Sequence, residues 1–156
     1  MYVCTFDVTA ATAAVDFFEF TPADDKPIVL HALYIGQTTE AGDAMEELLP
    51  WSIQRGGTAM TTGSGGTTAA NGVVCGPSGA TSGFTFEAMN TTPATFTAGV
   101  VVHRDAFNVR VGLQYIPTPE TRISASQANG GFVIRLGAAP ADTISWTGSA
   151  LVEEQG

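Results

Sequence analysis

Apolar and polar residues alternate in short runs along most of this chain, and turn residues separate the runs. Near the start, Cys4, Phe6 and Val8 occupy every second position. The same alternation recurs over residues 106–116 and 143–153. Side chains on a strand point alternately to the two faces of a sheet, so this period indicates half-buried β-strands. The sequence therefore predicts an all-β protein.

The number and spacing of these runs predict the architecture. There are about nine of them, and turn signals recur at the spacing of about 8–12 residues that is typical of sandwiches and barrels. We predict an antiparallel β-sandwich of the jelly-roll type with eight to nine strands. The 156 residues fit a single domain, residues 1–156, which can bury a core without a disulfide or metal. Residues 37–47 are interpreted as a loop with room for a short helix.

Residues 56–83 are rich in Gly, Ser and Thr and contain few apolar side chains. Such a composition buries little surface to offset the entropy of ordering the chain. A loop of this length inside a compact domain is usually either functional or disordered. Two interpretations stay open: a long flexible surface loop, or an arm that becomes ordered against a neighbouring subunit.

The charge balance excludes some partners. The net charge is −9, from 15 acidic and 6 basic residues, whereas binding to nucleic acid requires clustered Lys and Arg. The longest strongly apolar run, residues 28–35, is too short to cross a bilayer, and the first residues lack the pattern of a signal peptide. We expect no nucleic acid and no membrane among the partners, and synthesis in a cytoplasm.

The two cysteines, Cys4 and Cys75, are interpreted as free thiols. Cys4 alternates with apolar residues, which indicates a small buried side chain. A reducing compartment disfavours disulfides. A Cys4–Cys75 bridge is the alternative.

Residues that could carry catalysis are few and isolated. A cupin-type metal site needs a His-x-His pair and a nearby Glu, but His31 and His103 each stand alone and are interpreted as hydrogen-bonded packing residues. Ser64, in Gly-Ser-Gly-Gly, lacks the Asp that precedes the nucleophile of trypsin-like proteases. Neither a Gly-x-Ser-x-Gly elbow nor a phosphate-binding Gly-x-x-x-x-Gly-Lys is present. We expect no enzyme activity and no cofactor.

Acidic pairs and tryptophans give no further site. Adjacent carboxylates on a strand point to opposite faces, and the spacing of the loop carboxylates fits no known Ca²⁺ loop. Trp51 and Trp146 fall on apolar faces and are predicted to lie in the core.

Three blocks carry a resemblance to a known group of proteins. They are FFEFTPADDKPIVLHALYIGQTTEAGDAMEELLPWSIQRG, HRDAFNVRVGLQYIPTPETRISASQ and RLGAAPADTISWTGSALVEEQG. Their order of strand and turn segments resembles small virion proteins encoded by tailed phages and prophages. The resemblance implies a capsid decoration or cement protein. It carries over no functional residues.

As that resemblance implies, we expect a non-enzymatic virion protein on the capsid exterior. It would form a homotrimer that binds the outer face of the major capsid protein shell and stabilises it. Low charge and abundant Thr and Ala suit interface cores, which are depleted in charge. The candidate intersubunit contacts lie in the first strand and the 56–83 stretch: Tyr2, Val3, Arg55, Thr61, Thr62, Ser64, Thr67, Thr68 and Asn71.

Two other functions remain open. One is a receptor- or carbohydrate-binding module of a phage tail or fibre, which exposed aromatic residues lining one groove would favour. The other is a cupin-type enzyme with His31 and His103 as metal ligands.

Overall fold

The structure is a computed structural model that describes residues 1–39 and 47–156. Most of the expected loop and short helix at residues 37–47 lies outside the described residues. The strands are β1 (Tyr2–Ala11), β2 (Asp16–Thr21), β3 (Ile28–Gln37), β4 (Leu48–Arg55), β5 (Ala59–Thr61), β6 (Ala70–Val74), β7 (Thr81–Glu87), β8 (Thr95–Thr97), β9 (Val100–Asn108), β10 (Leu113–Tyr115), β11 (Ser124–Ala125), β12 (Phe132–Leu136) and β13 (Ile144–Glu154). Two short 3₁₀-helices, η1 (Pro119–Thr121) and η2 (Gln127–Asn129), complete the elements. The described residues contain no membrane-spanning helix.

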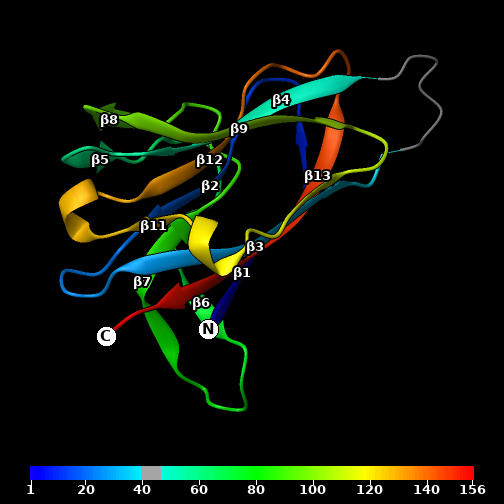
Figure 1. The fold of residues 1–156 in the computed structure, drawn as a ribbon. Coiled ribbons are helices and arrows are strands. Elements are labelled where there is room, and N and C mark those ends of the chain that lie inside the picture. Colours follow the sequence, from blue (N-terminus) through cyan, green and yellow to red (C-terminus); the bar gives the residue numbers. More distant parts are fainter. Residues whose placement is uncertain (40–46) are drawn as a thin grey trace.

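The all-β prediction is confirmed, but the prediction of a sandwich is wrong. Ten antiparallel strands follow one another in the order β10-β3-β13-β1-β6-β7-β2-β12-β4-β9, and they form a nearly closed barrel (Figure 1). The short β11 adds to β3, and β5 and β8 pair separately.

Strand β6 explains the difference. It lies between β1 and β7, so without it the order would break into one sheet of four strands and another of five. Those two sheets would resemble the sandwich that the sequence predicts. β6 lies within the 56–83 stretch, where its sequence, ANGVV, offers little alternation. The sequence prediction treats residues 56–83 as a loop, so it omits the strand that joins the four-stranded and five-stranded parts of the barrel.

Aromatic packing closes the seam of the barrel between β9 and β10, the two ends of the strand order. The ring of His103 on β9 lies 4.6 Å from the ring of Tyr115 on β10 and 4.8 Å from Trp51 on β4, measured between centroids. The tight turn that joins β9 to β10 needs Gly112, whose φ is +78° and whose N–H donates to the Asn108 carbonyl. His103 is thus a packing residue, as the sequence predicts, but its buried Nε2 has no hydrogen-bond partner in the described structure, so the predicted hydrogen bond is wrong.

Phenylalanine and tryptophan rings fill the interior. The Phe20 ring lies 4.9 Å from Phe132 and 5.5 Å from Phe18, and Trp146 meets Phe17 at 5.3 Å. These side chains are fully buried, and offset or edge-on ring pairs add to the stabilisation that burial provides. Both tryptophans lie in the core, as predicted.

The 56–83 stretch is not one long loop, because it contains β5, β6 and the start of β7. Residues 56–67 and 88–97 pair with each other, through β5–β8 and the Ser64–Thr92 bridge, and we call these two segments the flap. The flap is fastened to the barrel by the Gly63 N–H, which donates to Glu19 on β2. Whether this stretch also contacts a neighbouring subunit stays a prediction.

Close backbone approach explains the glycines of the flap. A Cβ atom at Gly63 would lie 2.0 Å from the Thr92 carbonyl oxygen, and one at Gly66 would lie 2.1 Å from that of Ala88. Real Cβ atoms do not approach other atoms this closely, so glycine is required at both positions. The glycine-rich composition of the flap, which suggests flexibility, therefore allows its backbone segments to pack closely.

A buried charge cluster lies beneath the flap and consists of Asp16 and Glu19 on β2 and Arg135 on β12. A bulge in β2 produces it: Phe18 pairs with Ile134 and Asp16 with Arg135, which leaves Phe17 as an extra residue. Arg135 binds the Asp16 carboxylate with two nitrogens, Nε at 2.5 Å and Nη2 at 2.8 Å. Asp16 and Glu19 have no solvent-exposed surface.

Both cysteines are free thiols, as predicted, with Cys4 buried and Cys75 exposed. Burial, and secondarily the nearby Cys75, raises the pKa of the Cys4 thiol to about 12. We expect Ellman's reagent at pH 8 to modify one thiol per native chain rapidly. The second should react at least ~100-fold more slowly, because it must await opening of the barrel.

Unfolding in denaturant should expose both thiols, and Cys75→Ser should abolish the rapid phase. Two rapid thiols in the native protein would contradict the burial of Cys4, and none after unfolding without reductant would indicate a disulfide.

Candidate functional site

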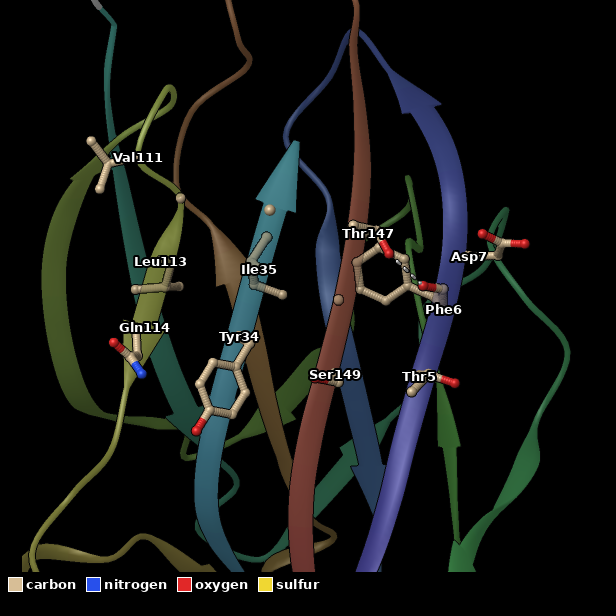
Figure 2. Close-up of a pocket in the computed structure, with 13 residues that line it drawn as sticks. Thr5, Phe6, Asp7, Tyr34, Ile35, Val111, Leu113, Gln114, Thr147 and Ser149 are labelled. Atoms are coloured by element: carbon tan, nitrogen blue, oxygen red, sulfur yellow. Dashed lines mark hydrogen bonds between the residues drawn. The ribbon is translucent and has the colours of Figure 1, made fainter. Parts of the chain in front are cut away.

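A groove of about 860 Å³ crosses the outer face of β1, β13, β3 and the β10 edge (Figure 2). We call it the outer groove. Its lining comes from four segments: Thr5, Phe6 and Asp7; Tyr34, Ile35 and Gly36; Val111, Gly112, Leu113 and Gln114; and Thr147, Gly148 and Ser149. Its volume lies within the range of about 300–1,000 Å³ that is usual for ligand sites.

Strand register explains both the polarity and the depth of this groove. Thr5 pairs with Ser149, Ser149 with Tyr34, and Tyr34 with Gln114, so these four side chains form one outward row. In the next row Thr147 pairs with Gly36, where the outer face carries no side chain. The small residues leave a hollow beside the taller Tyr34, as Figure 2 shows.

The polar side chains of the first outward row are available to a ligand. The side chains of Thr5, Ser149, Tyr34 and Gln114 have no hydrogen-bond partner among the described residues. Thr147 differs, because its hydroxyl donates to the Phe6 carbonyl at 3.3 Å. Among the described residues that line the groove, Asp7 is the one charged side chain. The site therefore offers neutral donors and acceptors.

A line of aliphatic side chains borders the groove. Val73 on β6 pairs with Val3 on β1, Val3 pairs with Leu151 on β13, and Leu151 pairs with Ala32 on β3. Ile116, one residue beyond the Tyr115–Leu33 pair, continues the line. Val73 and Ile116 are 60% and 59% exposed and Val3 and Leu151 are partly exposed, whereas Ala32 is buried, at 4%. We call these five residues the apolar row.

Neither histidine lies in a cluster of potential metal ligands among the described residues. His31 Nε2 lies 2.6 Å from Glu153 Oε2 on the outer face, and His103 lies in the aromatic seam. Within residues 1–39 and 47–156, no group of three His, Cys, Asp or Glu side chains is placed to hold a metal ion. His31 is therefore hydrogen-bonded, as predicted, and nothing in the described geometry supports the cupin-type alternative.

The candidate intersubunit contacts from the first strand differ in orientation. Val3 points outward in the apolar row. Tyr2 points inward, with its ring 5.7 Å from that of Phe84 and edge-on to it.

The other candidates lie on and around the flap. Thr61, Thr62, Ser64 and Thr67 are on the flap and Thr68 follows it, while Thr67 also accepts a hydrogen bond from the Ala88 N–H. Arg55 donates to the Ser124 carbonyl, and Asn71 donates to the Ser82 carbonyl. The nine residues thus do not form one patch, and whether any contacts a neighbour stays a prediction.

Sequence reasoning misses the outer groove. Tyr34 stands in a run that is apolar on both sides, IVLHALYIG, and this run predicts a buried strand. The available signal is small residues in mid-strand, Gly36 and Gly148, which indicate a thin place in a sheet. That signal can be used once register has brought the strands together.

Comparison of the chain with protein-family models, with curated proteins and with solved structures finds no match. The fold and site therefore define a class in structural terms: an all-β barrel protein with a polar groove and an apolar row on its outer face.

Proposed function

We propose that this protein is a non-enzymatic phage virion protein that decorates the outer face of the major capsid shell. The apolar row is the observation that supports this proposal. The phage setting rests on the sequence resemblance described above.

The apolar row has the character of a protein contact. Single exposed aliphatic residues are ordinary, but a contiguous patch on a monomer often marks an interaction site. Here the backbone pairing aligns Val73, Val3 and Leu151 across three adjacent strands. A row without charged side chains suits the centre of an interface, where charge is depleted.

We assign the apolar row to the shell. Most candidate contacts between copies lie on and around the flap and not in the apolar row. The flap side remains for contacts between copies in the proposed trimer. Three such faces on one trimer would bind a shell tightly even if each were weak, because linked contacts raise avidity.

A negative charge in the apolar row should abolish shell binding. We expect Leu151→Asp to weaken co-sedimentation with shells of the same phage's major capsid protein at least tenfold, since burying an unpaired carboxylate costs more than the ~1.4 kcal/mol that a tenfold loss represents. Binding isotherms from sedimentation at increasing shell concentration would measure the change.

Val100→Asp is the matched control, because Val100 is also exposed, at 53%, and lies on β9, which contributes no residue to the row. It should bind as the unmodified protein does. Equal binding by both variants would remove the apolar row from the shell contact.

The outer groove supports a second candidate function, a receptor- or carbohydrate-binding module of a tail or fibre. The specific observation is an exposed aromatic side chain, Tyr34, beside polar groups without protein partners among the described residues.

A further inference from the structure

We propose that the outer groove binds a neutral saccharide. The inference deepens the second candidate function by naming its ligand class; it concerns the groove alone and holds whether or not the apolar row contacts a shell. It rests on three features: an aromatic wall, a row of uncommitted polar side chains, and the absence of basic residues from the described lining.

Tyr34 provides the aromatic wall. Its side chain is 38% exposed on the outer face of β3, and Figure 2 shows its ring standing beside Gln114. One face of a pyranose ring presents several C–H groups, which pack on an aromatic face with little loss of hydration. The phenol hydroxyl adds a polar end to the same side chain.

The polar row matches the hydroxyl groups of a sugar. Thr5 and Ser149 each offer a hydroxyl that both donates and accepts, and the Gln114 amide offers two donors and an acceptor. Sugar hydroxyls also donate and accept, so paired contacts with such groups are possible along the row. Because these side chains have no described protein partner, binding would not break existing hydrogen bonds.

Charge selects a neutral ligand. No Lys, Arg or His is among the described lining residues, whereas Asp7 contributes a carboxylate to the rim. Sialic acids, sulfated sugars and phosphates would meet a chain of net charge −9, with no cation in the described lining to attract them. A single carboxylate also provides too few ligands for Ca²⁺, which takes about six to eight oxygens.

An oligosaccharide fits the groove better than a compact apolar ligand does. The groove is open to solvent along the outer face, and one wall is a row of polar side chains rather than an enclosed apolar cavity. A ligand held here must therefore remain partly hydrated while one face is covered, which suits a sugar chain.

A saccharide panel tests the inference without capsid shells. The full-length chain would be applied to immobilised neutral oligosaccharides of glucose, galactose, mannose and N-acetylglucosamine, and to sialylated forms of the same chains. We expect binding to at least one neutral oligosaccharide and at least fivefold weaker binding to its sialylated form. The absence of binding to every neutral member at millimolar ligand would overturn the proposal, as would preference for the sialylated form.

Variants locate the binding site. For the best neutral oligosaccharide, calorimetry should show at least a tenfold weaker Kd for Tyr34→Ala and about threefold to tenfold for Gln114→Ala, as loss of a stacking face or a hydrogen bond implies. Tyr34→Phe should retain most of the affinity. Val100→Ala, outside the groove, should change nothing. Melting temperatures within a few degrees of the unmodified protein would verify folding, and unchanged affinity in folded Tyr34→Ala would overturn the proposal.

Discussion

Replacing Arg135 by Met should destabilise the protein by about 3–5 kcal/mol, the range found when one partner of a buried ion pair is removed. Asp16 would keep a carboxylate with no exposed surface and would lose both guanidinium hydrogen bonds. Arg135 also donates to the Ala94 carbonyl, so the 88–97 segment of the flap should loosen as well. Urea unfolding followed by tryptophan fluorescence would measure the loss.

Arg104→Met is the control, because Arg104 is exposed on β9, which β4 separates from β12 in the strand order. Exposed substitutions of this kind usually change stability by less than about 0.5 kcal/mol. The double variant Asp16→Asn with Arg135→Met should recover part of the loss, since it removes the uncompensated charge. Equal effects of Arg135→Met and Arg104→Met would show that the buried pair contributes nothing.

Replacing Glu19 by Gln should remove a pH dependence of stability. Burial, assisted by the nearby Asp16 carboxylate, raises the pKa of Glu19 from its ordinary value of 4.5 to about 7, although hydrogen bonds from Asn90 and Gly63 act in the opposite direction. One carboxylate oxygen, Oε1, has no hydrogen-bond partner in the described structure. Compared with the unfolded chain, the folded protein therefore favours the protonated form of the Glu19 carboxyl group.

The direction of this pH dependence follows from the number of protons that the folded and unfolded chains bind. Between pH 4.5 and 7 the folded chain retains a proton that the unfolded chain releases, so the free energy of unfolding falls as pH rises and levels off above pH 7. A shift of this size corresponds to at most about 3 kcal/mol. The amide introduced by Glu19→Gln carries no titrating proton, so this variant should gain stability over the unmodified protein at pH 8 and little at pH 4.5.

Urea unfolding at pH 4.5, 6 and 8 would measure this difference. Glu120→Gln changes an exposed carboxyl group on η1 whose pKa is lowered by hydrogen bonds, so it should leave the fall in stability between pH 6 and 8 as it is in the unmodified protein. A gain for Glu19→Gln that is the same at all three pH values would contradict the account of Glu19.

The sequence predicts strand content well because the two-residue period is local. Alternation at Cys4 and Phe6 and the apolar faces of Trp51 and Trp146 correctly identify buried positions. The closure of the sheet depends on β6, where Gly72 faces inward against Tyr2, Cys4 and Phe84 in place of a larger apolar residue. A glycine that makes room for neighbouring side chains looks, in the sequence, like a glycine in a loop.

The candidate sites depend on register, which the sequence does not specify. The charge cluster exists because a bulge moves Asp16 to the outer face beside Arg135, whereas simple alternation would place it with Phe18. The outer groove likewise needs Tyr34, Ser149 and Thr5 to align across three strands that are far apart in the chain. Such alignments become visible only after the strands are paired.

Light scattering of the purified protein, alone and after addition of capsid shells of the same phage, tests the central proposal most directly. The account predicts a stable trimer in solution and a saturable gain in shell mass in whole trimers. A monomer that adds no mass to shells at any concentration would contradict the proposed decoration function.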